Sequence, residues 1–301
     1  MIVRIGTRNS DLALWQAHYI RTKLSELDIK IEILEIESFG DRIQDIPIHK
    51  LGDKGVFTKA LDEALINNDI DLAVHSLKDV PTVLHEELVL CAVPTRENPF
   101  DVLVRSHQSD SNAKQRIIAT GSIRRTAFWK NRFPEDSVIG LRGNVPTRIR
   151  KIDTQDCYGG IFAYAGLHRL QLDGRISQVL TWMVPAPSQG ALGIIIRKDS
   201  TLHQTISQLE DPYARRCVDI ERSFMNKLEA GCSSPVGGYA HIKDQQLLFH
   251  GTVLSVDGRT RIDINKQIPV DSAHTDRGKE WAEEALEQGA SALVHRHTER
   301  G

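Results

Sequence analysis

The residues of this sequence that are best suited to chemistry stand in polar turns that follow apolar strands. In the stretch 70–81, a compact apolar run ends in Ser76, Lys78 and Asp79. Chemistry in open α/β sheets takes place beyond the carboxyl ends of the strands. At such a position an aspartate can transfer protons or stabilise positive charge, and a lysine can hold an anion. Taken alone, however, one such turn more often carries a solvated surface pair.

Further turns of this kind carry guanidinium and hydroxyl groups. Residues 7–10 lead into a predicted helix, and residues 120–125, 141–148 and 163–169 repeat the arrangement. The candidate ligand-binding residues in these turns are Arg8, Ser10, Thr120, Ser122, Arg124, Arg125, Arg142, Arg148 and Arg169. Helix starts attract anions, and guanidinium groups bind carboxylates through paired hydrogen bonds. A single arginine more often forms a surface salt bridge, but the recurrence at strand ends predicts a site for a ligand with several carboxylates or phosphates.

Cys232 is the one cysteine whose surroundings are unusual, because it stands in the loop sequence Gly231-Cys232-Ser233-Ser234-Pro235 after a predicted helix. Cysteines more often behave as small buried hydrophobic residues, which is how we interpret Cys91, Cys157 and Cys217. A loop thiol is either a nucleophile, which needs a nearby base, or a point of covalent attachment. The sequence pattern leaves both readings open.

The connection between about residues 37 and 55 is long, and such connections often cover active sites. It carries Lys50 and Lys54 and is followed by Phe57. Its glycines lack the G-x-x-x-x-G-K-[ST] spacing, so we exclude a Walker-type nucleotide site. We therefore predict a flexible segment that carries these two lysines, which are either solvated on the surface or part of a site.

Composition excludes several classes of protein. The 301 residues carry a net charge of −2, which argues against a general binder of nucleic acid or membrane surfaces. No apolar run approaches the roughly 20 residues that span a bilayer, and no signal peptide precedes the first strand pattern, so we expect a cytoplasmic protein. The four cysteines form no C-x-x-C pair and the 12 histidines lack metal-ligand spacing, so we predict no metal site.

The elements that must position these residues alternate between strands and helices, which favours an α/β fold with parallel sheets. The predicted strands span residues 1–6, 31–36, the first half of 70–81, 88–93, 100–105, 117–120, 138–141, 160–163 and 191–196. The predicted helices span 11–27, 58–66, 122–133, 146–152, a segment around 167, 211–230 and 277–287. Hairpin-like strands at 239–241, 247–254 and 261–264 indicate a smaller C-terminal unit of antiparallel character.

Two linker-like stretches, 94–99 and 184–190, bracket the middle of the chain. They predict a second domain inserted into the first, with a cleft between them. We assign residues 1–95 with 190–208 to domain 1, on the Asp79 side of the cleft. Residues 100–185 form domain 2, on the arginine-rich side, and residues 211–301 form domain 3, which carries Cys232.

Taken together, the motifs resemble those of the porphobilinogen deaminase (hydroxymethylbilane synthase) family over residues 4 to about 241. The stretches that carry the resemblance are Thr7-Arg8-Asn9-Ser10 with Leu12-Ala13-Leu14-Trp15-Gln16-Ala17, Gly52-Asp53-Lys54-Gly55-Val56-Phe57, Val74-His75-Ser76-Leu77-Lys78-Asp79-Val80-Pro81, Ser122-Ile123-Arg124-Arg125, Leu141-Arg142-Gly143-Asn144, Ala165-Gly166-Leu167, Gln189-Gly190-Ala191 and Gly231-Cys232. Each is weak alone, but together they are highly specific.

The resemblance implies a transferase of tetrapyrrole and haem biosynthesis that condenses four porphobilinogen molecules head to tail, with release of ammonia, into hydroxymethylbilane. It implies two periplasmic-binding-protein-like α/β domains around a cleft, plus a small C-terminal α+β domain. It also implies a monomer and a dipyrromethane cofactor in thioether linkage to Cys232. The alternative from another class is a non-catalytic bilobal protein that binds polycarboxylates.

The resemblance also assigns roles to individual residues. Asp79 would be the catalytic carboxylate, hydrogen-bonded to pyrrole N–H groups, and Lys50, Lys54 and Phe57 would belong to the mobile loop. Cofactor and substrate would be bound by the nine residues of the arginine- and hydroxyl-bearing turns together with Ser76, Lys78 and Gln189. The chain departs from the family pattern where we expect glycine, at Ala119, Pro146, Ser188 and Ala230, and where Gly121 replaces a serine or threonine.

Overall fold

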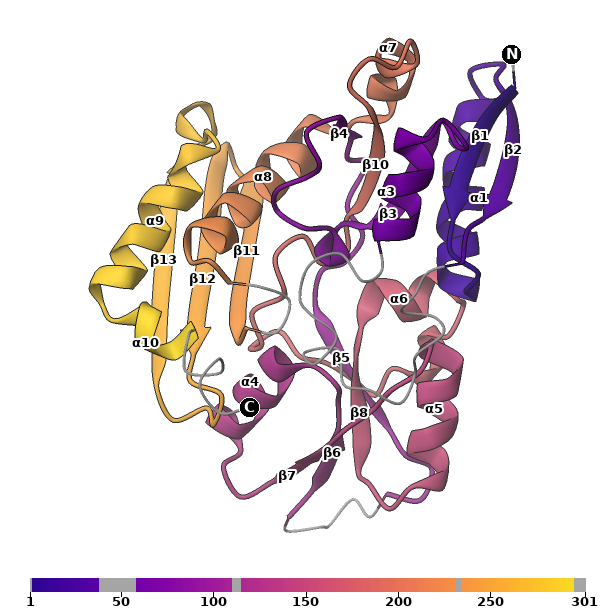
Figure 1. Cartoon of the computed structure of the whole chain (residues 1–301). Helices are drawn as coiled ribbons and strands as arrows, with labels where there is room; N and C mark the ends of the chain where they lie inside the picture. Colours follow the sequence, from indigo (N-terminus) through magenta and orange to yellow (C-terminus); the bar gives the residue numbers. More distant parts are fainter. Residues whose placement is uncertain (1, 38–57, 110–114, 231–233, 295–301) are drawn as a thin grey trace. The chain divides into compact units, whose positions relative to one another are not determined.

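The computed structural model describes residues 2–37, 58–109, 115–230 and 234–294 (Figure 1). Contacts divide the chain into two compact units. The first contains residues 1–97 and 190–215, and the second contains residues 98–189 and 216–301.

The first unit is built on a five-stranded mixed sheet with the order β2-β1-β3-β10-β4. Its strands are β1 (Ile2–Thr7), β2 (Lys30–Glu35), β3 (Leu72–Ser76), β4 (Leu88–Ala92) and β10 (Leu192–Arg197). Strand β1 is parallel to β2 and β3, whereas β10 is antiparallel to both of its neighbours. Because β1 and β3 are adjacent and parallel, the residues after Thr7 and Ser76 lie at the same edge of the sheet.

Helices cover this sheet through apolar faces. They are α1 (Asp11–Ser25), α3 (Lys59–Ile66) and α7 (His203–Ile206), with 3-10 turns η2 (Leu77–Asp79) and η4 (Ser207–Leu209). Helix α1 begins at Ser10, whose hydroxyl accepts a hydrogen bond from the Ala13 N–H at 3.3 Å, as predicted for an N-cap. Ala17, Ile20 and Leu24 on α1 join Val3 and Val74 of the sheet in one buried core.

The second unit contains another five-stranded mixed sheet, with the order β7-β6-β8-β5-β9. Its strands are β5 (Asp101–Arg105), β6 (Ile117–Ala119), β7 (Ser137–Ile139), β8 (Gly159–Ala163) and β9 (Gln178–Val179). Its helical elements are α4 (Ile123–Arg132), α5 (Val145–Thr154), α6 (Tyr164–Arg169) and the turn η3 (Asp173–Arg175). Strands β7, β6 and β8 are parallel, and β5 is antiparallel to both β8 and β9.

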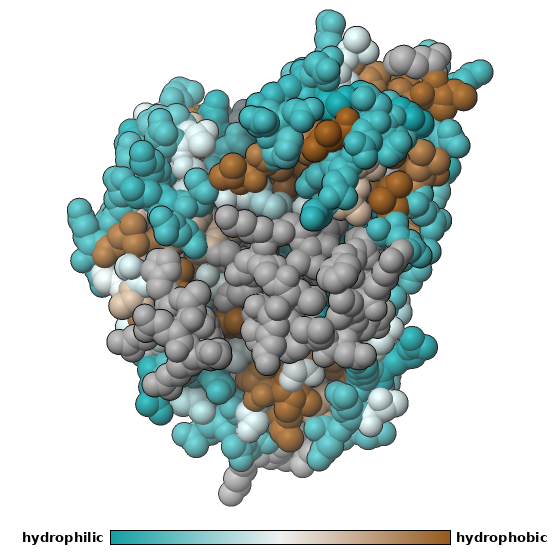
Figure 2. Space-filling view, in the orientation of Figure 1, coloured by the Kyte–Doolittle hydropathy of each residue, from teal (hydrophilic) through white to brown (hydrophobic). Residues whose placement is uncertain are grey.

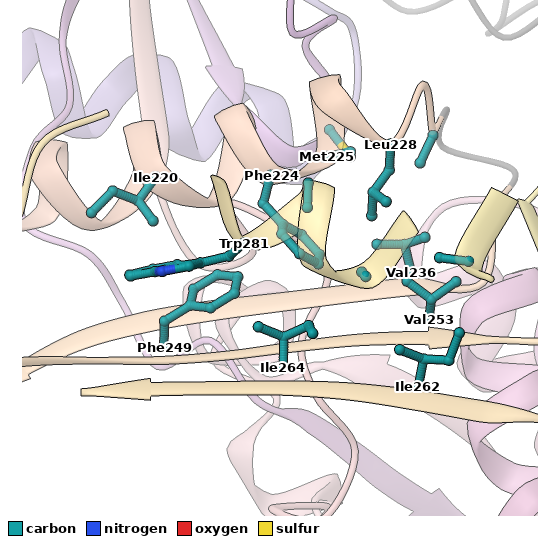
Figure 3. Packing of buried hydrophobic residues seen from close by; sticks show 14 of the residues in the cluster. Ile220, Phe224, Met225, Leu228, Val236, Phe249, Val253, Ile262, Ile264 and Trp281 are labelled. Carbon is teal, nitrogen blue, oxygen red and sulfur yellow. The ribbon is translucent and has the colours of Figure 1, made fainter. Parts of the chain in front are cut away.

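The same unit contains a three-stranded antiparallel sheet near the C-terminus. It consists of β11 (Val236–Lys243), β12 (Gln246–Leu254) and β13 (Arg261–Pro269), together with α8 (Pro212–Lys227), η5 (Val270–Ser272), α9 (Asp276–Glu287) and α10 (Ala290–Val294). Figure 3 shows Ile220 and Phe224 of α8 facing Phe249 and Ile264 of the sheet, with Trp281 of α9 beside Phe249. These residues belong to the largest cluster of buried hydrophobic side chains in this unit. Because each strand buries alternate residues and each helix buries one face against this cluster, the sequence pattern predicted both kinds of element.

The predicted α/β fold class with a small C-terminal sheet region is confirmed. The expectation of parallel sheets is wrong in part, because β10 in the first sheet and β5 in the second run antiparallel to both of their neighbours. The alternation of strands with helices does not reveal these reversals, since a strand that re-enters a sheet after a long excursion can arrive in either direction. The division of the chain into three domains stays a prediction.

Polar side chains dominate the surface of the described residues on the face shown in Figure 2, and hydrophobic residues occur there in separate areas. Large exposed hydrophobic side chains lie on different elements, such as Ile2 on β1, Val179 on β9 and Tyr213 on α8. Among the described residues, no helix is long and apolar enough to span a membrane.

Helix α9 lies directly against α8 at Gly278, where a Cβ atom would collide with the Ile220 carbonyl oxygen. A Cβ atom at this position would lie 2.8 Å from the Phe224 backbone nitrogen and 2.9 Å from Ser223 Cβ. The neighbours on α8 are partly backbone, so they cannot rotate away. Glycine is therefore required here by space rather than by backbone conformation.

Replacing Gly278 with alanine is expected to destabilise the protein by about 1–3 kcal/mol, because overpacking separates α8 from α9. The direction of the change in stability is informative, since a glycine-to-alanine substitution in an exposed helix would stabilise that helix by about 1 kcal/mol. Urea unfolding measures the difference. Gly174→Ala is the matched control, because no atom lies within 4 Å of a Cβ built there. Equal stability of Gly278→Ala and the wild type would contradict the packing argument.

Strand β3 carries a buried histidine. His75 is 6% exposed, and among the described residues its Nε2 atom has no hydrogen-bond partner. Burial lowers the pKa of His75 to about 4, and the positive charge of Arg8 acts in the same direction. The imidazole is therefore neutral at physiological pH.

This histidine makes the stability of the protein depend on pH. Below about pH 6.5 the unfolded chain binds a proton at His75 that the folded chain does not bind until about pH 4, so stability falls as the pH decreases through this window. We expect a loss of about 3 kcal/mol at pH 4 from this group. Urea unfolding between pH 7 and pH 4 should show a shallower decline for His75→Gln than for the wild type. The control His18→Gln, at an exposed position on α1, should retain the steep decline. Identical curves for His75→Gln and the wild type would refute the assignment.

Candidate active site

The 3-10 turn η2 presents Lys78 and Asp79 at the carboxyl end of β3. Leu77 is fully buried and Val80 is 1% exposed, whereas Asp79 between them is exposed. The Leu77 N–H donates to the Ala191 carbonyl at 3.0 Å, and the Val80 N–H donates to the Leu77 carbonyl at 3.2 Å. Two buried anchors thus hold an accessible carboxylate on a short turn, which restricts where that carboxylate can point.

Ser76, the last residue of β3, is held from the neighbouring helix. The Gln16 amide nitrogen on α1 donates to the Ser76 hydroxyl oxygen at 2.8 Å, and Gln16 is 3% exposed. Because the hydroxyl accepts this bond, its own hydrogen remains available to a ligand. The sequence reasoning missed the role of Gln16. The sequence did contain a signal for this role, because Gln16 is a polar residue on the otherwise apolar, buried face of the helix that follows the first turn.

Arg8 and Ser10 occupy the turn between β1 and α1, at the same sheet edge as Ser76 and Asp79. The Ser10 N–H donates to the Arg8 carbonyl at 3.0 Å, and the Ser10 hydroxyl caps α1. Arg8 is partly buried, and its charge is close enough to His75 to lower the pKa of that residue. The first unit therefore brings together five of the predicted site residues: Arg8, Ser10, Ser76, Lys78 and Asp79.

In the second unit, Thr120 and Ser122 form the turn between β6 and α4. The Thr120 hydroxyl oxygen accepts from the Ser122 N–H at 3.2 Å, and the Ser122 hydroxyl oxygen accepts from the Arg125 N–H at 3.4 Å. Ser122 is thus the N-cap of α4, at the start of the helix predicted over residues 122–133. The cap fixes the start of the helix and with it the positions of Arg124 and Arg125.

Arg124 and Arg125 converge on Asp101, the first residue of β5. Arg124 Nη2 lies 2.7 Å from Asp101 Oδ2, and Arg125 Nη2 lies 2.8 Å from Asp101 Oδ1. The arginines are 4% and 7% exposed and the aspartate is fully buried. Burial by itself would raise the pKa of Asp101, but the two guanidinium groups lower it, so the carboxylate is ionised. Two positive charges share one negative charge, which leaves this buried group with an excess positive charge.

Gln189 completes the arrangement around Asp101. Its amide nitrogen donates to Asp101 Oδ1 at 3.0 Å and to the Pro99 carbonyl at 2.7 Å. Each guanidinium group also donates to one main-chain carbonyl, Arg124 Nη1 to Val184 and Arg125 Nη1 to Ile161. We call Asp101, Arg124, Arg125 and Gln189 the Asp101 cluster.

Sequence reasoning missed Asp101, although an acidic residue opening the otherwise apolar strand Asp101-Val102-Leu103-Val104 was a signal. Its position follows from the reversal of β5. This strand is antiparallel to β8 and pairs Asp101 with Ala163, the last residue of β8. The first residue of β5 therefore lies at the edge where the parallel strands end.

Arg142, Arg148 and Arg169 lie beyond the ends of β7 and β8, at the same edge of the second sheet. Asn144 caps α5 through the Thr147 N–H at 3.0 Å, and Arg148 Nε donates to the Gly143 carbonyl at 2.6 Å. Arg169, in the last turn of α6, is 6% exposed. The second unit thus gathers at one sheet edge the eight predicted site residues that lie in its described ranges.

The four remaining predictions fall on residues outside the described ranges: Cys232, Lys50, Lys54 and Phe57. Within the described ranges, no three histidine, cysteine, aspartate or glutamate side chains form a group that could hold a metal ion.

Comparison with known proteins gives matches over almost the whole chain. A model described as "Porphobilinogen deaminase, dipyromethane cofactor binding domain" matches residues 3–205, and a model of the C-terminal domain of porphobilinogen deaminase matches residues 215–287. Porphobilinogen deaminase from Carboxydothermus hydrogenoformans is 38% identical, covering 97% of this chain and 96% of the relative. The enzyme from Syntrophotalea carbinolica is 41% identical, covering 97% and 95%.

Among solved structures, a periplasmic substrate-binding protein of an ABC transporter from Coxiella burnetii aligns with a TM-score of 0.43 at 13% identity, covering 71% of this chain and 94% of that one. The two family models and the nearly full-length relatives determine the family without it. The chain belongs to the porphobilinogen deaminase family.

Proposed function

We propose that Asp79 is the catalytic carboxylate in this chain's reaction, the condensation of four porphobilinogen molecules head to tail, with release of ammonia, into hydroxymethylbilane. The reaction follows from membership of the family. The single observation that carries the assignment of Asp79 is the anchored turn η2, which exposes this carboxylate between two buried residues.

The chemistry requires a fixed negative charge. When ammonia leaves porphobilinogen, the pyrrole becomes electron-poor and positive charge develops on the ring. A carboxylate held beside the pyrrole N–H stabilises that charge without having to reorganise. The same group can also transfer protons: as the acid it donates a proton to the departing amine, and the carboxylate that remains removes one from the pyrrole carbon that forms the new bond, which restores the acid.

The cationic and hydroxyl groups would hold the acetate and propionate side chains of the pyrroles. In the first unit these are Lys78, Arg8, Ser10 and Ser76. The two hydroxyls already accept hydrogen bonds from within the protein, so each has its O–H available as a donor.

The second unit offers the Asp101 cluster together with Thr120, Ser122, Arg142, Arg148 and Arg169. The excess positive charge of the Asp101 cluster is the property that supports this role, because a carboxylate from the ligand would balance it. Donor groups of this kind fit a dipyrromethane cofactor, which carries acetate and propionate groups and supplies the primer from which the pyrrole chain grows.

We propose Cys232 as the attachment point of the cofactor. The other three cysteines are buried, with Cys91 6%, Cys157 6% and Cys217 5% exposed. Burial raises the pKa of the Cys91 thiol to about 11 and also raises that of Cys157. Such thiols are poor nucleophiles at neutral pH. This leaves the loop cysteine, Cys232, as the better candidate for attachment of the cofactor.

The non-catalytic polycarboxylate binder is not supported by the comparisons, since the matched family models and relatives are enzymes. A binder of carboxylates also has no use for an exposed aspartate among its cations.

We further propose a cytoplasmic monomer. Cys91 and Cys157 form no disulfide bond, as expected in a reducing compartment. The exposed hydrophobic residues of the described surface lie on separate elements, which supports a chain that needs no partner. Light scattering of the purified protein tests the monomeric state.

Cofactor attachment is tested by intact mass. Protein made in cells with a working tetrapyrrole pathway should exceed its sequence mass by one dipyrromethane, whereas Cys232→Ser should have its sequence mass and no turnover. Cys91→Ala is the control and should retain the added mass, because Cys91 is buried in the core of the first unit. An unmodified wild type that stays inactive with porphobilinogen would overturn the proposed function.

Asp79→Ala is expected to lower kcat by at least about 100-fold, because it removes both charge stabilisation and proton transfer. The fold and the added cofactor mass should remain, since neither depends on an exposed side chain. Single-turnover assays with porphobilinogen measure the effect. Glu86→Ala, at another exposed carboxylate of the first unit, is the control and should be fully active. Near-normal turnover of Asp79→Ala would remove Asp79 from its role.

A further inference from the structure

Glu221 on α8 is a buried acidic residue that the proposed reaction does not use. It is fully buried, and each of its carboxylate oxygens accepts a hydrogen bond from a main-chain N–H. Oε2 accepts from Ser188 at 2.6 Å, and Oε1 accepts from Ala240 on β11 at 2.7 Å. One carboxylate therefore links three segments of the second unit: helix α8, strand β11 and the stretch 184–189.

The Ser188 end of this link is conformationally demanding. Ser188 has φ +64, in the left-handed region that favours glycine, and it stands where the family pattern leads us to expect glycine. It is 1% exposed, and among the described residues its hydroxyl oxygen has no hydrogen-bond partner. The hydroxyl thus contributes nothing that holds the turn. The turn is held by the bond from the Gln189 N–H to the Ala186 carbonyl at 2.9 Å and by the short bond from the Ser188 N–H to Glu221, which stabilises the strained conformation directly.

The residue that follows this turn is Gln189, whose amide binds Asp101 Oδ1. Asp101 in turn binds Arg124 and Arg125. A continuous series of buried hydrogen bonds therefore runs from Glu221 through the Ser188–Gln189 turn to both guanidinium groups. Every member of the series is less than 10% exposed, so water is a poor substitute for a lost bond.

We propose that Glu221 is a positioning residue for substrate binding: it fixes the Ser188–Gln189 turn, through which the Asp101 cluster holds its two arginines in the geometry that receives ligand carboxylates. The inference rests on the proposed function, because it assigns carboxylate binding to Arg124 and Arg125. Glu221 itself touches neither substrate nor cofactor in this account. Its loss acts on the affinity for porphobilinogen and leaves the chemistry at Asp79 unchanged.

Glu221→Gln is the primary variant. An amide offers one acceptor oxygen, and its NH2 group would face one of the two main-chain N–H donors. We expect KM for porphobilinogen to rise about 10-fold while kcat stays within about 3-fold of the wild type, since ground-state and transition-state binding are lost together. Assays are run well below the melting temperature, on protein whose cofactor mass has been verified.

Ser188→Gly provides the rescue. Glycine adopts a positive φ without strain, so the turn no longer depends on the bond to Glu221. The double variant Ser188→Gly/Glu221→Gln should recover most of the lost affinity, and Ser188→Gly alone should have the KM of the wild type. This recovery separates a role in positioning the turn from a general contribution to stability.

Leu24→Ala is the control for stability. Leu24 is fully buried in the core of the first unit, in the last turn of α1 and away from the turn that carries Arg8 and Ser10, so its truncation should lower the melting temperature and leave KM unchanged. If Glu221→Gln lowered the melting temperature without raising KM, as expected of Leu24→Ala, the proposal would be overturned. A raised KM that Ser188→Gly failed to reverse would overturn it as well.

If Glu221→Gln does not fold, Glu221→Asp takes its place, since the shorter carboxylate cannot reach both N–H groups. A raised KM that Ser188→Gly reverses supports the proposal, and an unchanged KM refutes it. Failure of the proposed function would be recognised separately, because the wild type itself would then lack the cofactor mass and the turnover of porphobilinogen.

Discussion

The ion pairs between Asp101 and two arginines are the constraint on which the second unit depends. Burying a guanidinium group is costly unless a carboxylate compensates it, and here one fully buried carboxylate compensates two. This explains why β5 must be reversed relative to β8, because only the antiparallel direction places Asp101 beside the end of β8. It also explains why the capped start of α4 follows β6 so closely, since the cap delivers both arginines to the same point.

The first unit applies a different constraint to its acidic residue. Asp101 is buried and paired, whereas Asp79 is exposed and stands between the buried residues Leu77 and Val80. The two carboxylates are thus suited to opposite tasks. A paired carboxylate organises cations, and an accessible one can approach a ligand that carries its own N–H groups. Environment, rather than residue type, separates the two roles.

Local features were predictable from the sequence, and features that join distant segments were not. Ser10 and Ser122 were recognisable at the starts of predicted helices because the signal lies within three residues of each, and the apolar periods located α1 and α8. The bond from Gln16 to Ser76 and that from Ser188 to Glu221 join residues 60 and 33 positions apart, and no local pattern encodes such pairs. The direction of β10 was unpredictable for the same reason, since its partners precede it by about a hundred residues in the chain.

The place of β10 in the first sheet has a consequence for how the protein is made. Strand β10 lies between β3 and β4, so neither strand can acquire that neighbour until residues 93–191 have been synthesised. At roughly 5–20 residues per second, this delay lasts on the order of several seconds. During that time β3, which carries the turn with Asp79, has an unpaired edge on a nascent chain. The sheet can close only after the whole inserted segment has left the ribosome, so this unit begins first and is completed late.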